Sequence, residues 1–237
     1  MGGYGELREE AFRANMEIKA RSLAIYTWGN VSAFDPVRAV FAIKPSGVVY
    51  EELSPDRMVV VDLEYRVVEG ELKPSSDMKT HAILYRSFGA AGVRGITHTH
   101  STYATSWAQA RLDIPLFGTT HADHLAVPVP CTEYLDEKAV RGDYEENTGK
   151  LIVDTFKARG LAPMEVGMVL VGGHGPFAWG GSAAASVYNA TVLEEVARMA
   201  AITVSLGNSD RMLPPWIVRK HWERKHGTSA YYGQERT

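Results

Sequence analysis

Short apolar runs alternate along the chain with segments of helical periodicity, and this alternation is the strongest constraint on its fold. The run at residues 166–171 is continuously apolar, which is typical of a strand buried on both faces, and residues 93–100 are also strand-like. Between such runs, apolar residues recur at helical spacing, for example over residues 6–22 and 145–159. The pattern predicts an α/β protein with one central sheet, mixed or antiparallel in part, and helices on its faces.

The remaining elements follow from the same reading. Further strands are expected at residues 39–43, 58–63 and 67–68, and further helices at residues 78–88, 103–110, 182–206 and 214–226. The tripeptide Trp28-Gly29-Asn30 is expected to be a break between elements. Because no shift in composition separates one half of the chain from the other, we predict a single domain over residues 1–237.

Composition and charge exclude several classes of function. Of the 237 residues, 45% are hydrophobic and 22% are charged, which is ordinary for a soluble domain with its own core. The net charge of −3 offers no basic surplus for binding nucleic acid. Cys131 is the only cysteine and is interpreted as a small apolar core residue. With no signal peptide and no membrane-spanning apolar run evident, we expect a soluble, cytoplasmic protein that does not bind membranes.

A histidine pair at the end of one predicted strand points to a metal site. His98 and His100 are two residues apart, so in a strand their side chains point the same way. His174 follows a second predicted strand, and Asp77 begins a predicted helix. Three imidazoles and a carboxylate suit Zn²⁺, with Mn²⁺ and Co²⁺ left open. A lone histidine is more often structural, and an H-x-H pair also occurs in non-haem iron enzymes and metallohydrolases.

Two similar loops are candidate phosphate sites. Lys44-Pro45-Ser46-Gly47 follows one predicted strand, and Lys73-Pro74-Ser75-Ser76 precedes the helix that begins beside Asp77. Each combines a cation, a hydroxyl and a turn, and the second adds a helix N-terminus. Either loop alone is also a common surface turn. The glycine-rich nucleotide loops and the nucleophile-elbow motif of serine hydrolases are absent from the sequence.

These motifs, taken in order, resemble the class II aldolase/adducin head family. The resemblance runs from the first predicted helix to Gln234 and rests on five further or extended segments. They are Thr27-Trp28-Gly29-Asn30-Val31-Ser32, Gly118-Thr119-Thr120-His121-Ala122-Asp123, His174-Gly175-Pro176-Phe177-Ala178-Trp179-Gly180, Lys225-His226-Gly227 and Ala230-Tyr231-Tyr232-Gly233-Gln234.

The resemblance implies a fold, a metal set and a substrate class. The fold would be a three-layer α/β/α domain around a mainly antiparallel sheet, assembled as a homotetramer with active sites between subunits. The substrate would be a small sugar phosphate. One metal ion per subunit would be held by Asp77, His98, His100 and His174. The phosphate would be held by Gly29, Asn30, Ser46, Gly47, Ser75 and Ser76, with Lys44 close by.

Within the family, the chain is most similar to epimerases that act on phosphorylated pentuloses. This similarity implies Asp123 and Tyr232 as the catalytic acid and base, with Tyr232 supplied to a neighbouring subunit by the tail at residues 228–237. His221 and Arg224 lie three apart on the last predicted helix and share a face, so they are candidates for binding substrate across the interface.

Three alternatives lie within the same family. The first is an aldolase. In that branch of the family, the position that Asp77 occupies here is as a rule a catalytic glutamate. A non-catalytic adducin-like domain would lack the metal ligands. A dehydratase of a sugar phosphate would share the metal and phosphate sites but would not account for the match at Asp123 and Tyr232.

Overall fold

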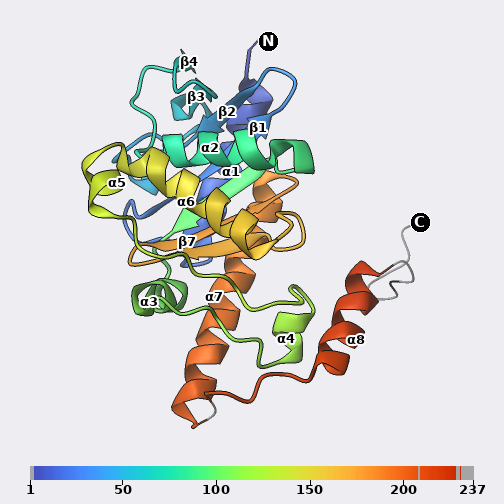
Figure 1. Ribbon diagram of the computed structural model, residues 1–237. Helices are drawn as coiled ribbons and strands as arrows, with labels where there is room; N and C mark the ends of the chain where they lie inside the picture. Colours follow the sequence, from blue (N-terminus) through green and yellow to red (C-terminus); the bar gives the residue numbers. More distant parts are fainter. Residues whose placement is uncertain (1–2, 208, 228–229, 231–237) are drawn as a thin grey trace.

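A seven-stranded sheet runs through the centre of the computed structural model, which describes residues 3–207, 209–227 and 230 (Figure 1). The strand order is β4-β3-β2-β1-β5-β7-β6, and each neighbouring pair is antiparallel. The strands are β1 (Gly29–Asp35), β2 (Val40–Ile43), β3 (Val59–Asp62), β4 (Val67–Glu69), β5 (Gly95–Thr99), β6 (Met168–Val171) and β7 (Gly175–Gly180). The sheet confirms the expected α/β class with a mainly antiparallel sheet.

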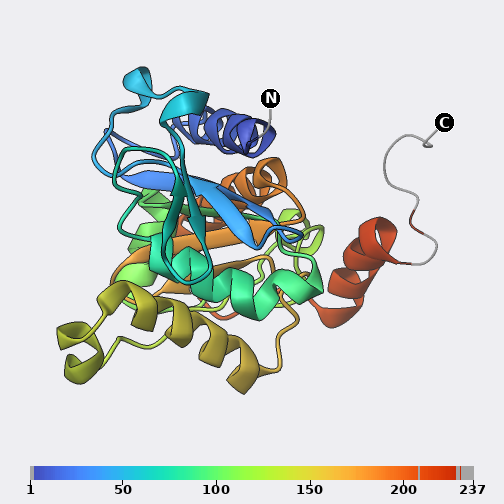
Figure 2. The same ribbon diagram turned by 90° about the horizontal axis from the view of Figure 1, so that it is seen from above.

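Helices cover both faces of this sheet, which gives the expected three layers (Figure 2). The α-helices are α1 (Gly5–Ala20), α2 (Met78–Phe88), α3 (Thr102–Ala110), α4 (Thr119–Ala122), α5 (Glu137–Arg141), α6 (Tyr144–Arg159), α7 (Ala183–Ser205) and α8 (Pro215–His226), with short 3-10 turns at Tyr50–Glu52, Pro55–Arg57 and Gly89–Ala91. Helices α1 and α7 pack on one face, and the pair α2 and α6 packs on the other. No helix in the described part of the chain is both long and apolar enough to cross a bilayer.

Strand β1 occupies the middle of the sheet, and its two faces meet different helices. Gly29 on one face lies close to Ile18 of α1. On the other face, Ser32 hydrogen-bonds to His81 of α2 and Phe34 stacks on a tyrosine of the same helix. Six of the seven residues of β1 are buried, so this strand is part of the core in spite of its polar sequence.

The expected break at Trp28-Gly29-Asn30 is therefore wrong, because Gly29 and Asn30 open a central strand. Strand β7 is likewise not among the expected elements. Both segments are rich in residues that usually mark turns, namely glycine, asparagine, serine and aspartate in β1 and two glycines and a proline in β7. The other expected strands and helices are present, with ends that differ by a few residues.

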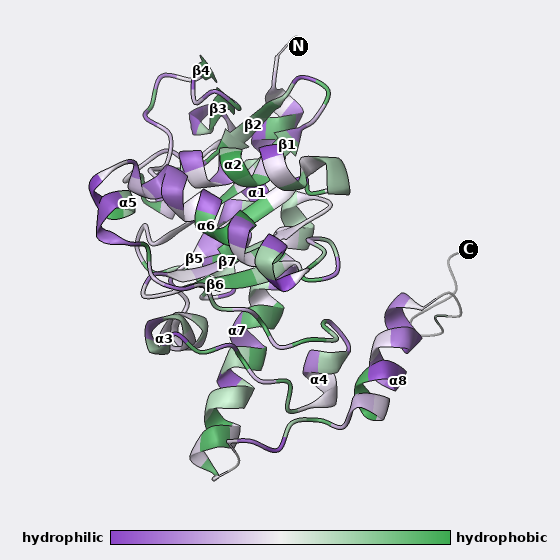
Figure 3. Ribbon diagram, viewed as in Figure 1, coloured by the Kyte–Doolittle hydropathy of each residue, from purple (hydrophilic) through white to green (hydrophobic). Residues whose placement is uncertain are grey.

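The C-terminal half of α7 and helix α8 extend away from the sheet (Figure 1). Helix α8 packs against the short helix α4. Hydrophobic residues continue along α7 beyond the sheet, into its lower half (Figure 3).

Candidate metal centre and substrate site

The antiparallel pairing of three strands explains why the candidate residues gather at one edge of the sheet. Because β1 and β5 are antiparallel, the start of β1 lies beside the end of β5, and Asn30 is opposite His98. Because β5 and β7 are antiparallel, the start of β7 also lies beside the end of β5, and Phe177 is opposite His98. His174 immediately precedes β7, so residues far apart in sequence meet here.

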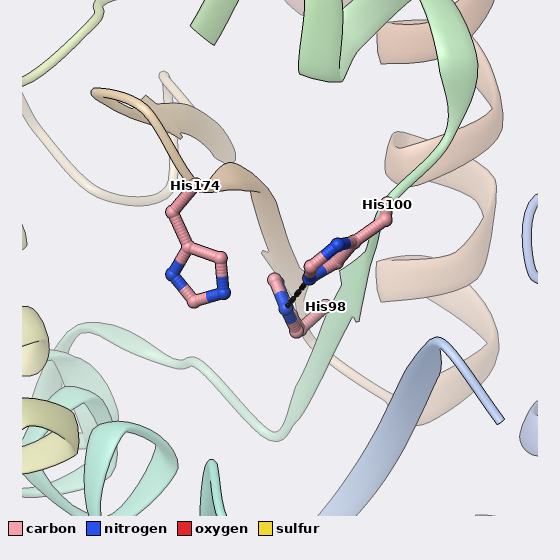
Figure 4. Close-up of side chains that lie close together, drawn as sticks. All are labelled: His98, His100 and His174. Carbon is pink, nitrogen blue, oxygen red and sulfur yellow. Dashed lines mark hydrogen bonds between the residues drawn. The ribbon is translucent and has the colours of Figure 1, made fainter. Parts of the chain in front are cut away.

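The three histidines converge in space (Figure 4). One ligand nitrogen from each of His98, His100 and His174 lies within 4.8 Å of the other two. The Nε2 atoms of His98 and His100 are 3.1 Å apart. Two nitrogens that each bind a cation at about 2.0–2.1 Å lie at most about 4.2 Å apart, so this spacing fits a shared metal ion.

Neighbouring groups orient His98. Its Nδ1 donates a hydrogen bond to the carbonyl oxygen of Pro176 at 2.9 Å, and its ring stacks on Phe177 at a centroid distance of 4.2 Å. A proton on Nδ1 leaves the Nε2 lone pair for a metal ion. Gly175 permits this close packing, because a Cβ there would lie 2.9 Å from the carbonyl oxygen of Thr99.

Burial keeps these imidazoles in the form that binds metals. Desolvation lowers the pKa of His100, and His98 nearby lowers it further. Desolvation also lowers the pKa of His174, with a second contribution from His98. Both rings are therefore neutral near pH 7, and a neutral imidazole is the ligand form. The donor set fits a divalent metal ion such as Zn²⁺.

Asp77 lies beside the histidine group but not within the set whose ligand atoms are mutually closer than 4.8 Å. It occupies the N-cap position of α2 without making a capping hydrogen bond. Instead, its Oδ2 accepts a hydrogen bond of 2.7 Å from Asn30 Nδ2. Burial opposes ionisation of Asp77, but electrostatic interactions with the neighbouring histidine rings and the hydrogen bond from Asn30 outweigh it, so its pKa lies below the ordinary value. Its role as the fourth ligand stays a prediction.

The two candidate phosphate loops lie side by side. Pro45 and Pro74 form an isolated antiparallel bridge. The backbone N–H of Ser46 donates to the carbonyl oxygen of Lys73, and that of Ser75 donates to the carbonyl oxygen of Lys44, both at 2.9 Å. Ser46, Gly47 and Ser76 are exposed, whereas Ser75 is buried.

Lys44 is a buried cation beside these loops. Its side chain is almost fully covered, its Nζ donates to the carbonyl oxygen of Pro45 at 3.3 Å, and it lies 5.2 Å from the ring centre of Tyr50. In the described part of the chain, no carboxylate oxygen lies within 4.0 Å of this amine. Burial lowers its pKa to about 8, and an anionic ligand would restore the charged form. The Tyr50 hydroxyl donates to the carbonyl oxygen of Gly29 at 2.8 Å, which ties β1 to the same group.

Asp123 forms a separate cluster with α8 of the same chain. Its carboxylate accepts hydrogen bonds from His221 Nδ1 at 2.9 Å and from Arg224 Nε at 2.8 Å, and a second Arg224 nitrogen completes a two-point ion pair. Burial opposes ionisation of Asp123, but these hydrogen bonds outweigh it and hold its pKa below the ordinary value. Among the described residues, Asp123 itself has hydrogen bonds or ion pairs with α8 and none with the three histidines. Tyr232 lies outside the described residues.

Two residues near the histidines are missed by the sequence reasoning. His81 lies one helical turn after Asp77, and this i, i+4 spacing on α2 is a signal by which it was detectable. Tyr144 begins α6, and its hydroxyl lies 3.4 Å from Nδ1 of His174. Nothing in the sequence near Tyr144 links it to a histidine thirty positions later, because only tertiary packing brings the two together.

Comparisons with known proteins identify the family and the fold. Residues 9–201 match the family model for the Class II Aldolase and Adducin N-terminal domain. An L-fuculose 1-phosphate aldolase has a similar structure, with a TM-score of 0.78 and 24% identity over 92% of this chain and 95% of that one. YgbL from Klebsiella pneumoniae has a TM-score of 0.70 and 28% identity over 91% and 97% of the two chains. The L-fuculose-1-phosphate aldolase of Thermus thermophilus has a TM-score of 0.61 and 22% identity over 87% and 99%. The family match spans most of the chain, which therefore belongs to the class II aldolase and adducin N-terminal domain family.

Proposed function

We propose that this protein is a metal-dependent L-ribulose-5-phosphate 4-epimerase that interconverts L-ribulose 5-phosphate and D-xylulose 5-phosphate. The observation that carries the proposal is the position of three convergent histidines at the same sheet edge as two paired loops, each with a serine, and a buried lysine. A metal ion and a phosphate held at neighbouring sites are what a reaction on a phosphorylated ketose requires. The similarity at Asp123 and Tyr232 selects the epimerase within the family.

The chemistry explains why a family of aldolases would include an epimerase. The hydrogen on C4 of a 2-ketose is not acidic, so simple proton abstraction does not invert that carbon. Breaking the C3–C4 bond gives an enediolate and glycolaldehyde phosphate. If the aldehyde turns before the bond forms again on its other face, the configuration at C4 is inverted and no atoms are gained or lost.

The metal ion would be held by His98, His100 and His174, with Asp77 proposed as the fourth ligand. When bound, a divalent cation such as Zn²⁺, one per subunit, acts as a Lewis acid that stabilises negative charge on the sugar oxygens. Asn30 donates a hydrogen bond of 2.7 Å to the Asp77 carboxylate. We therefore propose that Asn30 orients this ligand as well as binding the substrate phosphate.

The paired loops and Lys44 would anchor the phosphate while the aldehyde turns. Ser46, Gly47 and Ser76 are exposed at this edge and offer hydroxyl and backbone donors to an anion. Burial lowers the pKa of the Lys44 amine to about 8, and a phosphate beside it would raise this pKa again and stabilise the charged form. A fixed phosphate allows rotation of the fragment without its release.

Acid and base groups on opposite faces of the aldehyde are needed, because its oxygen gains or loses a proton on either side. We assign these roles to Asp123 and Tyr232. Because the Asp123 cluster makes no contact with the histidines of its own chain, we propose that a site is completed by a second copy in a homotetramer. His221 and Arg224 would then orient Asp123 in addition to binding the substrate.

The alternative is a class II sugar-phosphate aldolase of the L-fuculose-1-phosphate type, which would share the first step and release the fragments. The presence of an L-fuculose 1-phosphate aldolase among the similar structures makes this a specific rival. Asp77 argues against it, because its side chain is shorter than glutamate and is held by Asn30.

A product assay tests the proposal. The purified protein, treated with chelator and then reloaded with Zn²⁺ or Mn²⁺, is given L-ribulose 5-phosphate, and the products are separated. We expect metal-dependent D-xylulose 5-phosphate, and we expect His98→Asn to lose both metal content and turnover. Release of two- and three-carbon fragments without the epimer would support the aldolase. Full turnover in the chelator-treated protein would contradict metal dependence.

A further inference from the structure

The backbone at His174 belongs to a turn rather than to a strand. His98 lies within β5, but His174 lies in the turn between β6 and β7 and is flanked by Gly173 and Gly175. Gly173 has a φ of +73°, a left-handed conformation that glycine adopts without strain and that makes the turn possible. An imidazole on such a turn needs an outside partner to hold its ring toward the metal position.

Helix α6 supplies that partner. The hydroxyl oxygen of Tyr144 lies 3.4 Å from Nδ1 of His174, and the two ring centroids are 5.9 Å apart. In the close-up of the site, the His174 ring extends from its turn toward the other two histidines (Figure 4). The distance is long for a hydrogen bond, as such contacts often are before a ligand is bound.

The start of α6 is fixed to the helix that carries Asp77. Asp143 forms an ion pair with Lys79 of α2, and its side chain caps α6 by accepting from the backbone N–H of Glu146. The Thr80 hydroxyl donates to the carbonyl oxygen of Glu145 at 2.6 Å. Tyr144 therefore stands on a rigid element whose position is set relative to the metal site.

The direction of the contact follows from proton positions. An imidazole that binds a metal ion through Nε2 carries its proton on Nδ1 and donates it to an oxygen. His98 donates its Nδ1 proton to the carbonyl oxygen of Pro176. We propose that Tyr144 is a positioning residue, whose hydroxyl oxygen accepts the Nδ1 proton of His174 and so fixes the tautomer and direction of this ligand. The proposal rests on the proposed metal-dependent function.

Two variants separate this role from simple packing. Tyr144→Phe keeps the ring and removes only the acceptor oxygen. Tyr134→Phe is the matched control, because the Tyr134 ring packs beside Gly173 on the same turn and its side chain is largely exposed. Zn²⁺ affinity is measured by competition with a chromogenic chelator. We expect Tyr144→Phe to bind about 10- to 100-fold more weakly than wild type and Tyr134→Phe to bind as wild type does.

Nuclear magnetic resonance of the zinc-loaded protein gives a second readout that does not depend on activity. With ¹⁵N-labelled histidine, the Nδ1–H protons of His98 and His174 should both be visible in wild type. In Tyr144→Phe the His174 signal should be lost or broadened, while the His98 signal remains as an internal reference. Unchanged affinity with both signals present would overturn the role of Tyr144 and leave the proposed function standing. A wild-type protein that binds no Zn²⁺ would overturn the proposed function itself.

Discussion

At the scale of single residues, the most unusual group is a chain of buried polar side chains beneath the histidines. His81 is fully buried, and its Nδ1 lies 2.7 Å from the hydroxyl of Ser32, which lies 2.6 Å from the hydroxyl of Tyr85. Tyr85 donates its proton to the carbonyl oxygen of Ser32 at 3.2 Å. The Ser32 hydroxyl therefore bridges His81 Nδ1 and the hydroxyl of Tyr85.

This arrangement predicts a dependence of stability on pH. Burial lowers the pKa of His81 to about 3, whereas an unfolded histidine titrates near about 6.5. Below that value the unfolded chain takes up a proton that the folded chain does not, so the stabilisation is complete above about pH 6.5 and is lost as the pH falls. At about pH 5, His81 alone should lower the free energy of unfolding by roughly 2 kcal/mol.

Urea unfolding of chelator-treated protein, at neutral pH and near pH 5, measures this effect. In His81→Gln the free energy of unfolding should fall less between the two pH values than in wild type. The two proteins are compared by how much the free energy of unfolding falls between the two pH values, because the substitution also changes the absolute stability. A variant with the wild-type loss would show that the buried ring is not the titrating group.

At the scale of elements, the longer helices were predictable, whereas the short helices α4 and α5 and the strands β1 and β7 were not. Periodicity identified α1 and α6 because each buries one stripe of side chains against the rest of the domain. Strand β1 was not predicted because its polar side chains find their hydrogen-bond partners only in the folded protein. Asn30 bonds to Asp77 at the start of α2, and Ser32 bonds to His81 within that helix. The local sequence therefore predicted the histidines and the loops as candidate site residues. Their proximity in space depends on long-range strand pairing, which the local sequence does not show.

A glycine in α6 shows how closely the elements around the site are packed. A Cβ added at Gly149 would lie 2.8 Å from Cβ of Ile83 and 3.2 Å from the carbonyl oxygen of Thr80, both on α2. Alanine would gain up to about 1 kcal/mol in helix propensity. It would also force the two helices apart, which costs about 1–3 kcal/mol.

We therefore expect Gly149→Ala to lower the free energy of unfolding despite the better helix former, by roughly 1–2 kcal/mol net. Metal affinity should fall as well, since α2 and α6 carry Asp77 and Tyr144. Gly5→Ala, at the start of α1 with no heavy atom within 4 Å of the added Cβ, is the matched control and should not be destabilised. Denaturant unfolding of the three proteins gives the comparison. A stabilised Gly149→Ala would mean that the helices yield without strain.

At the scale of the whole molecule, one apolar surface remains exposed, because no other part of the described chain packs against it. Met199 and Ile202 near the end of α7 and Leu206 at its C-cap lie at helical spacing, and they are 46%, 47% and 82% exposed. This end of α7 extends beyond the sheet (Figure 3). Trp216 on the neighbouring α8 is 73% exposed. An exposed stripe of this kind on a helix marks an interface between proteins. The Asp123 cluster joins the end of α4 to α8, which also extends away from the sheet (Figure 1), and we propose that a second copy that covers the α7 stripe meets this cluster too.

The proposed assembly is tested by placing a charge in this stripe. Ile202→Glu should give a particle of smaller mass than wild type by light scattering, because a buried unpaired carboxylate opposes association. Val37→Glu is the control, since Val37 is 92% exposed in the turn between β1 and β2 and should leave the mass unchanged. If active sites are shared between copies, turnover of Ile202→Glu should fall together with its mass while each folded chain still binds Zn²⁺. A wild-type particle of 26.1 kDa, or an Ile202→Glu particle of wild-type mass, would contradict an interface on α7.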